Sequence, residues 1–177
     1  MRLLLLIGLS VGLSVCAHAQ HDHAHSASPP DAPAASPDGP TPSGLSPSDV
    51  DGLLAGLGMG LARPAERHSY PGPLHVLEHA DDLGLTRSQR SLAETLRADV
   101  LARAQDIGAR IVGMERHLDA LFASGRASDA TVDRLTGHIA QAQGALRAIH
   151  LRAHVAMREA LTPDQIRTYD RLRGHTR

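Results

Sequence analysis

Two pairs of histidines in the C-terminal part of the chain have the spacing of metal ligands on a helix. His75 and His79 are four residues apart, and His150 and His154 repeat that spacing, with Met157 one turn further on. Residues four apart on a helix lie on one face, with Cβ atoms about 5–6 Å apart. Two imidazole nitrogens can then reach one ion at about 2 Å. The two pairs together predict a transition-metal site.

A glutamate is the expected carboxylate ligand of this site. If the two long helices described below form a hairpin that turns near residue 125, Met157 faces Glu94 and His154 faces Arg97. The short helix that carries the first histidine pair can fold over the same end. Imidazole and carboxylate groups suit Ni, Co, Zn or Cu(II), and a thioether makes the site softer. The ligand types therefore do not determine which of these metals is bound. The predicted ligands are His75, His79, Glu94, His154 and Met157, with His150 nearby.

Three more histidines, His21, His23 and His25, lie at the start of a Pro-rich segment. They have two interpretations, a tail that scavenges metal loosely or a leader of no consequence. No H-E-x-x-H, G-x-S-x-G or P-loop motif occurs in the sequence. We therefore predict that the protein is not an enzyme and has no catalytic residues.

Helical periodicity predicts the elements that position these side chains. Leu74 opens a short helix that stops near Gly84. Thr86 and Gln89 form a capping box, in which the Thr hydroxyl and the Gln side chain each satisfy a free backbone amide. Apolar residues spaced three and four apart then continue to Leu121, which is typical of a long amphipathic helix.

A break at residues 124–127 separates this helix from a second long one, which Ser128 or Asp129 caps. A second capping box, Thr162 to Gln165, opens a final short helix that reaches about Arg173. We therefore predict an all-α fold, a four-helix antiparallel hooked hairpin with two long helices flanked by two short ones. In this hairpin glycines would face each other and let the long helices approach closely, Gly108 beside Gly144 and Gly113 beside Gly137.

The N-terminal residues have the pattern of a secretory signal peptide. Within residues 1–19, Arg2 precedes a short apolar run, and residues 17–19 read Ala-His-Ala, a small-x-small cleavage site. Export to a periplasm follows, and cleavage would remove Cys16, the only cysteine. A lipid anchor on Cys16 is the alternative, which the bulk of Val15 disfavours.

Proline separates a leader from the folded part of the chain. Ten of the eleven prolines lie at or before Pro73, and segments rich in Pro, Ser and Asp bury too little apolar surface to fold. Residues 20–71 are therefore predicted to be a disordered leader, in which residues 48–62 could form a short glycine-interrupted helix. Residues 72–177 form the predicted metal-binding domain.

Charge and composition exclude some classes of protein. Eighteen Arg and no Lys stand against 19 acidic residues, for a net charge of −1. Without a basic excess to neutralise phosphates, nucleic-acid binding is not expected. Aromatic residues make up only 2% of the chain, which argues against a β-sandwich or barrel.

The two capping boxes also carry a resemblance to a known family. Both read L-T-x-x-Q, at residues 85–89 and 161–165, each before a helix of an exported helical hairpin. This resembles the periplasmic heavy-metal resistance and stress family that includes CnrX, ZraP, Spy and CpxP. The chain is most similar to the CnrX-like sensors, whose L-H-x-x-x-H is matched by Leu74, His75 and His79. Their late His and Met are matched by His154 and Met157, although with a spacing of three.

Two functions follow from the residues and the resemblance. The first is a periplasmic metal-binding protein, acting as sensor or in metal resistance, in which the ion draws the first helix onto the hairpin. The resemblance implies a membrane-bound regulatory partner, an anti-sigma factor or a sensor kinase. The alternative is a Spy-like, ATP-independent chaperone of envelope stress. Each long apolar stripe exceeds what one hairpin covers and needs either the short helices or a second subunit, and we expect a homodimer.

Overall fold

The computed structural model describes residues 39–175, which are helical and contain no strand. The predicted signal peptide with Cys16, and the leader histidines His21, His23 and His25, lie outside these residues. None of the described helices is long and apolar enough to span a bilayer. The described helices are α1 (Pro47–Leu54), α2 (Arg63–Glu66), α3 (Pro73–Glu78), α4 (Arg87–Ala123), α5 (Asp129–Ala160) and α6 (Pro163–Leu172).

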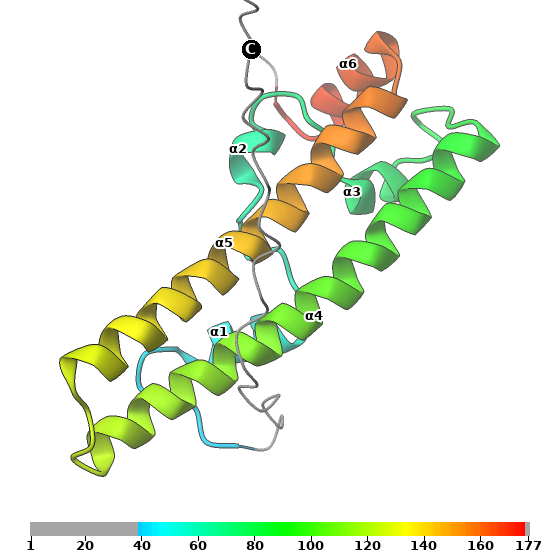
Figure 1. The fold of residues 1–177 in the computed structure, drawn as a ribbon. Coiled ribbons are helices and arrows are strands. Elements are labelled where there is room, and N and C mark those ends of the chain that lie inside the picture. Colours follow the sequence, from blue (N-terminus) through cyan, green and yellow to red (C-terminus); the bar gives the residue numbers. More distant parts are fainter. Residues whose placement is uncertain (1–38, 176–177) are drawn as a thin grey trace, which may run out of the picture.

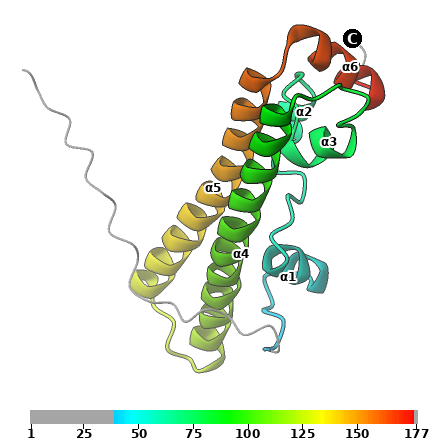
Figure 2. The same ribbon diagram turned by 90° about the vertical axis from the view of Figure 1, so that its right-hand side faces the viewer.

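The two long helices form the body of the molecule. α4 and α5 run side by side in opposite directions, and α1, α2 and α3 lie against one side of the pair (Figures 1 and 2). The predicted all-α class with two long helices is confirmed. The chain turns between them at Gly125, whose φ of 67° favours glycine. Besides the predicted four helices, the described chain has α1, which overlaps residues 48–62 where the sequence allowed a short helix, and α2, which was not predicted.

The predicted helix caps are present, and the glutamines of two capping boxes also hydrogen-bond to each other. Thr86, Ser128 and Thr162 cap α4, α5 and α6. In addition, the Gln89 Nε2 donates to Gln165 Oε1 at 2.9 Å, and the Gln165 Nε2 donates back to Gln89 Oε1 at 3.0 Å. The two L-T-x-x-Q motifs therefore tie the first turn of α4 to the first turn of α6.

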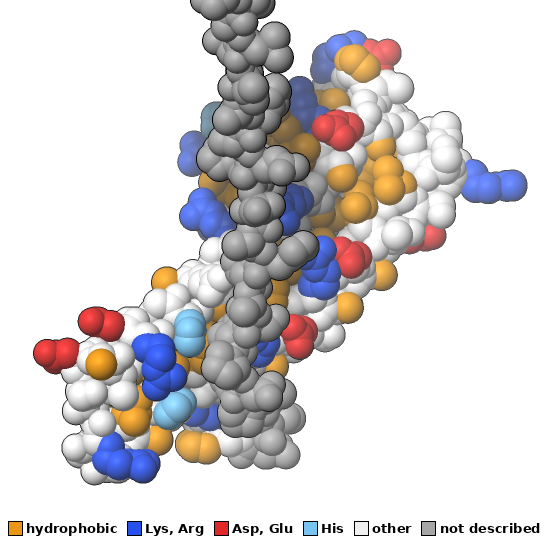
Figure 3. Space-filling view, viewed as in Figure 1, with side chains coloured by type: hydrophobic (Ala, Val, Ile, Leu, Met, Phe, Trp, Pro, Cys, Tyr) orange, Lys and Arg blue, Asp and Glu red, His pale blue; other side chains and the backbone are white. Residues whose placement is uncertain are grey.

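Two apolar clusters make up the core. The first joins α1 to α4 and α5 from their middle to the turn between them, and the second joins α3 and α6 to the end of the hairpin where α4 begins and α5 ends. The buried residues of the second cluster are Val76, Leu83, Ala93, Met157, Leu161 and Tyr169. On the face shown in Figure 3, further hydrophobic side chains gather between α4 and α5 in the half nearest α6.

Residues 39–71 of the predicted leader contain α1 and α2, and α1 overlaps residues 48–62, where the sequence allowed a short helix. Ser46 caps α1 with a capping box, and Val50 and Leu53 are buried in the first core cluster. Before α1, the Arg116 guanidinium donates to the backbone oxygens of Gly39 and Pro40, each at 2.8 Å. Burial of two large side chains offsets the weak helix propensity of this glycine-rich segment.

Gly108 of α4 makes room for α1. The hairpin register had instead predicted that Gly108 makes room for α5. A Cβ at position 108 would lie 2.1 Å from the Leu53 carbonyl oxygen of α1. At Gly137 and Gly144, on α5, an added Cβ would meet nothing within 4 Å. The prediction that Gly108 and Gly144 let the two long helices approach closely is therefore wrong, and Gly137 likewise has no close neighbour.

Candidate functional site

A cavity of about 400 Å³ lies between the α2–α3 segment and the hairpin. Its walls come from residues 56–62, from α2, from the start of α3 and from facing parts of α4 and α5. Three predicted ligands, His75, His150 and His154, line it. Along α5 the cavity lies between Ile149 of the first core cluster and Met157 of the second. The core is therefore interrupted by a cavity that is rich in imidazole.

His154 is held in one tautomer. Its Nδ1 lies 2.7 Å from the Tyr70 carbonyl oxygen, which only accepts hydrogen bonds, so Nδ1 carries the proton and the neutral ring keeps a lone pair on Nε2. This is the arrangement that orients metal-binding histidines. Gly72 leaves room for the ring, since a Cβ there would lie 2.9 Å from Nε2. His154 is therefore buried, oriented and able to donate a lone pair.

The Tyr70 carbonyl that orients His154 is itself held by α5. The Arg158 guanidinium lies over the Tyr70 ring, 4.6 Å from its centroid, and donates to the Ser69 carbonyl oxygen. The Ser69 hydroxyl donates to Asp170 of α6 at 2.7 Å. Together these contacts anchor the chain between α2 and α3 to α5 and α6.

His150 lies one turn before His154 and is 9% exposed. Its Nε2 is buried and has no hydrogen-bond partner among residues 39–175. Burial lowers the pKa of His150, and the neighbouring His154 lowers it further. A neutral imidazole is the form that binds a metal.

Acidification should destabilise the protein through His150. The pKa of His150 is lowered in the folded state, so below the unfolded value of about 6.5 the unfolded chain binds the proton more readily. The stability associated with the neutral ring is present above that pH and is lost as the pH falls. Urea unfolding at about pH 7.5 and pH 5 should show a smaller loss in His150→Gln than in the parent. Equal losses in both proteins would contradict this account, because the other titrating groups are common to both.

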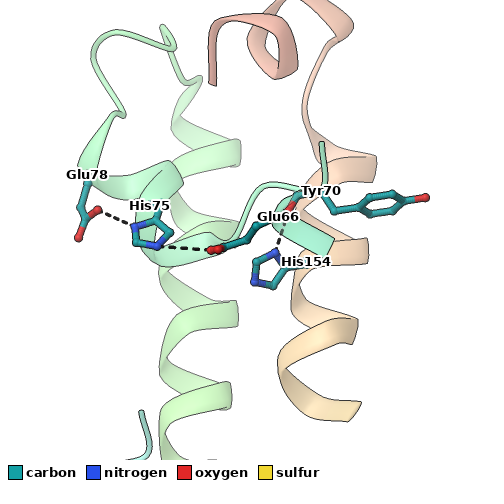
Figure 4. A network of polar contacts seen from close by, with 5 residues as sticks. All are labelled: Glu66, Tyr70, His75, Glu78 and His154. Carbon is teal, nitrogen blue, oxygen red and sulfur yellow. Dashed lines mark hydrogen bonds and ion pairs between the residues drawn. The ribbon is translucent and has the colours of Figure 1, made fainter. Parts of the chain in front are cut away.

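His75 has a carboxylate near each ring nitrogen. Its Nδ1 lies 2.8 Å from Glu78 Oε2, and its Nε2 lies 3.4 Å from Glu66 Oε1. The hydrogen bond from His75 lowers the pKa of the Glu78 carboxyl. Figure 4 shows the Glu66 side chain reaching from α2 between the His75 and His154 rings. Glu66 also lines the cavity, so it is the carboxylate that the structure places beside the imidazoles.

The other three predicted ligands lie elsewhere. α3 ends at Glu78, and His79 is its C-cap with φ −107° and ψ 23°, so the helical face that would align it with His75 does not continue. Its Nδ1 lies 3.7 Å from Asp82 Oδ2. Glu94 is exposed, and Met157 is fully buried in the second core cluster. None of the three lines the cavity.

Sequence reasoning missed Glu66, Tyr70 and Gly72. Glu66 and Tyr70 belong to the predicted leader, and Gly72 is the first residue of the predicted domain. The only local signal in this Pro-punctuated segment is Pro64 in the first turn of α2. The described side chains that could bind a metal do not lie within binding distance of one common point in this structure. Across residues 39–175, no three His, Cys, Asp or Glu side chains are grouped closely enough to hold a metal.

The residues that carry the resemblance to CnrX-like sensors are divided by the fold. Leu74, His75 and His154 line the cavity, whereas His79 and Met157 do not. Comparison of the chain with protein family models, curated proteins and solved structures finds no match.

Proposed function

We propose that this chain is a periplasmic heavy-metal-binding protein that acts as a sensor or in metal resistance. The observation that carries the proposal is the cavity into which α3 and α5 contribute imidazoles, with a carboxylate from α2 between them. Ni, Co, Zn and Cu(II) all suit imidazole and carboxylate ligands. The proposed ligands are His75, His154 and Glu66, with His150 as the fourth.

Binding of the ion includes a closing movement. Because the donors are not grouped within metal-binding distance, the α2–α3 segment has to move toward α5 for His75 and Glu66 to meet His154. The ion shifts this equilibrium only by its higher affinity for the closed form. A membrane-bound regulatory partner, either an anti-sigma factor or a sensor kinase, would respond to the difference, and a homodimer remains part of the proposal.

Calorimetric titration with Ni, Co, Zn and Cu(II) tests the metal site. The protein should carry His21, His23 and His25 as alanine, so that the leader contributes no signal. We expect one site with a Kd of about 1 μM or tighter, which corresponds to about −8 kcal/mol. His154→Ala should weaken binding by about 100-fold or more, because it removes a buried, oriented donor.

Variants of two glutamates distinguish the ligand set proposed from the structure, which includes Glu66, from the set predicted from the sequence, which includes Glu94. Glu66→Gln should weaken binding by at least about tenfold, whereas Glu94→Gln should leave the affinity unchanged because Glu94 is exposed outside the cavity. The reverse result would restore Glu94 as the ligand. A Kd weaker than about 1 mM for all four ions would exclude the metal-binding function.

The alternative function, an ATP-independent chaperone, is supported by a different surface. Hydrophobic side chains gather between α4 and α5 on the face shown in Figure 3, away from α1, α2 and α3. Unfolded clients could bind such a surface without the histidines. If no ion binds, suppression of client aggregation becomes the leading function.

A further inference from the structure

The mouth of the cavity gathers a large share of the exposed apolar side chains. Eight large hydrophobic residues of the described chain are more than a third exposed. Four of them, Leu57, Met59, Leu74 and Leu101, line this one cavity. They come from the loop after α1, from α3 and from α4, so residues distant in sequence converge here. Exposed apolar groups gathered around a concave site mark a binding surface.

The charge at this mouth has one dominant sign. Two guanidinium groups, Arg63 and Arg97, line the cavity. Among the described residues, Glu66 is the only carboxylate that lines it, and it lies 3.4 Å from the His75 imidazole. An apolar mouth with two arginines complements a ligand that has an apolar body and negative charges. A volume of about 400 Å³ falls within the range of about 300–1,000 Å³ that is typical of ligand pockets.

We infer that this mouth is a docking site for an acidic segment of a partner protein, which inserts one large apolar side chain between Leu57, Leu74 and Leu101. A single apolar anchor in a pocket, flanked by charged contacts, is a common source of affinity at protein interfaces. The carboxylates of the segment would pair with Arg63 and Arg97. The docking itself does not need a metal, and only its response to metal rests on the proposed function.

The loop at the mouth connects this docking site to the metal ligands. The ring of His150 lies against Gly58, where an added Cβ would be 3.7 Å from Nδ1 and from Cε1. Leu57 and Met59, on either side of Gly58, are two of the four exposed residues. A movement of α2–α3 and this loop on metal binding would therefore alter the apolar mouth. Docking of the acidic segment should have a different affinity in the metal-loaded protein.

Fluorescence anisotropy with labelled synthetic peptides tests the docking site on the full chain. The probe is Glu-Asp-Leu-Phe-Asp-Glu, compared with Glu-Asp-Ser-Ser-Asp-Glu and Lys-Lys-Leu-Phe-Lys-Lys. The first peptide should bind with a Kd of about 100 μM or tighter, and the other two at least about tenfold more weakly. Equal binding of the lysine peptide, or no binding of the acidic peptide tighter than about 1 mM, would overturn the inference.

Matched variants locate the binding surface. Arg63→Glu with Arg97→Glu, and separately Leu57→Ser, should each reduce affinity by at least about tenfold. Val155→Ser and Arg134→Glu change exposed residues outside the cavity and should leave it unchanged. Far-ultraviolet circular dichroism confirms that each variant is folded. Unchanged binding in the mouth variants would place the peptide elsewhere and overturn the inference.

Two further measurements separate the docking from its alternatives. Binding of decanoate without binding of the acidic peptide would overturn the inference in favour of a small amphiphile. Repeating the peptide titration with Zn²⁺ tests the link to metal. If peptide binds while no ion does, the docking stands and the metal function fails. If the ion binds and the peptide does not, only the docking fails.

Discussion

Replacing Gly108 with alanine is expected to lower the free energy of unfolding by about 1–3 kcal/mol, the usual cost of overpacking. The added Cβ would lie 2.1 Å from the Leu53 carbonyl oxygen and 2.6 Å from its carbonyl carbon. Because these are backbone atoms, no side-chain rotation relieves the clash, and α1 has to move away from α4. Urea unfolding measures the loss, and faster amide exchange in residues 47–54 locates it.

Gly137 is the matched control for this substitution. It lies in α5, and an added Cβ there would meet nothing within 4 Å. Gly137→Ala should therefore stabilise the protein by about 0.5–1 kcal/mol, because alanine has the higher helix propensity. If Gly108→Ala stabilises the protein as Gly137→Ala does, then α1 is not packed on α4 through this glycine.

Replacing Met157 with alanine should lower the free energy of unfolding by about 2–5 kcal/mol. The side chain is 0% exposed and lies in the second core cluster with Val76, Ala93 and Tyr169. Truncation leaves a cavity where α3, α4 and α6 meet α5. Met157→Leu keeps the volume and should cost less than about 1.5 kcal/mol. Thermal or urea unfolding of the two variants measures both effects.

The same pair of variants tests whether Met157 is a metal ligand. Its thioether is in the apolar core and does not line the cavity, so Met157→Leu should bind Ni, Co, Zn and Cu(II) as tightly as the parent. A loss of more than about tenfold in affinity, with stability retained, would restore the thioether ligand expected from sequence.

Local patterns predicted most of the helical framework because helix ends obey local rules. Thr86, Ser128 and Thr162 each cap the helix expected of them. Capping depends on a side chain and a backbone amide two or three residues away, and periodicity depends on neighbours three and four apart. Both can be read without knowing what the helix packs against.

Local patterns predicted only a possible short helix, at residues 48–62, between residues 39 and 71, because the order of this segment comes from distant contacts. Its glycines and prolines disfavour regular structure in isolation. Val50 and Leu53 are nevertheless buried against α4. The close approach of the Leu53 backbone to α4 depends on the missing side chain at Gly108, some fifty residues later in the chain. No local rule connects these positions.

The residues of the candidate site likewise fall into those that local sequence patterns predict and those that depend on distant contacts. Spacing along the sequence by itself determined that His150 and His154 share one face of a helix, and both line the cavity with His75. Tertiary structure alone decided the remaining members. α3 ends before His79, Met157 packs into the core, and Glu66 comes from a helix that has no clear sequence signal. Periodicity specifies a face within one helix, whereas the meeting of separate elements depends on how their apolar surfaces pack.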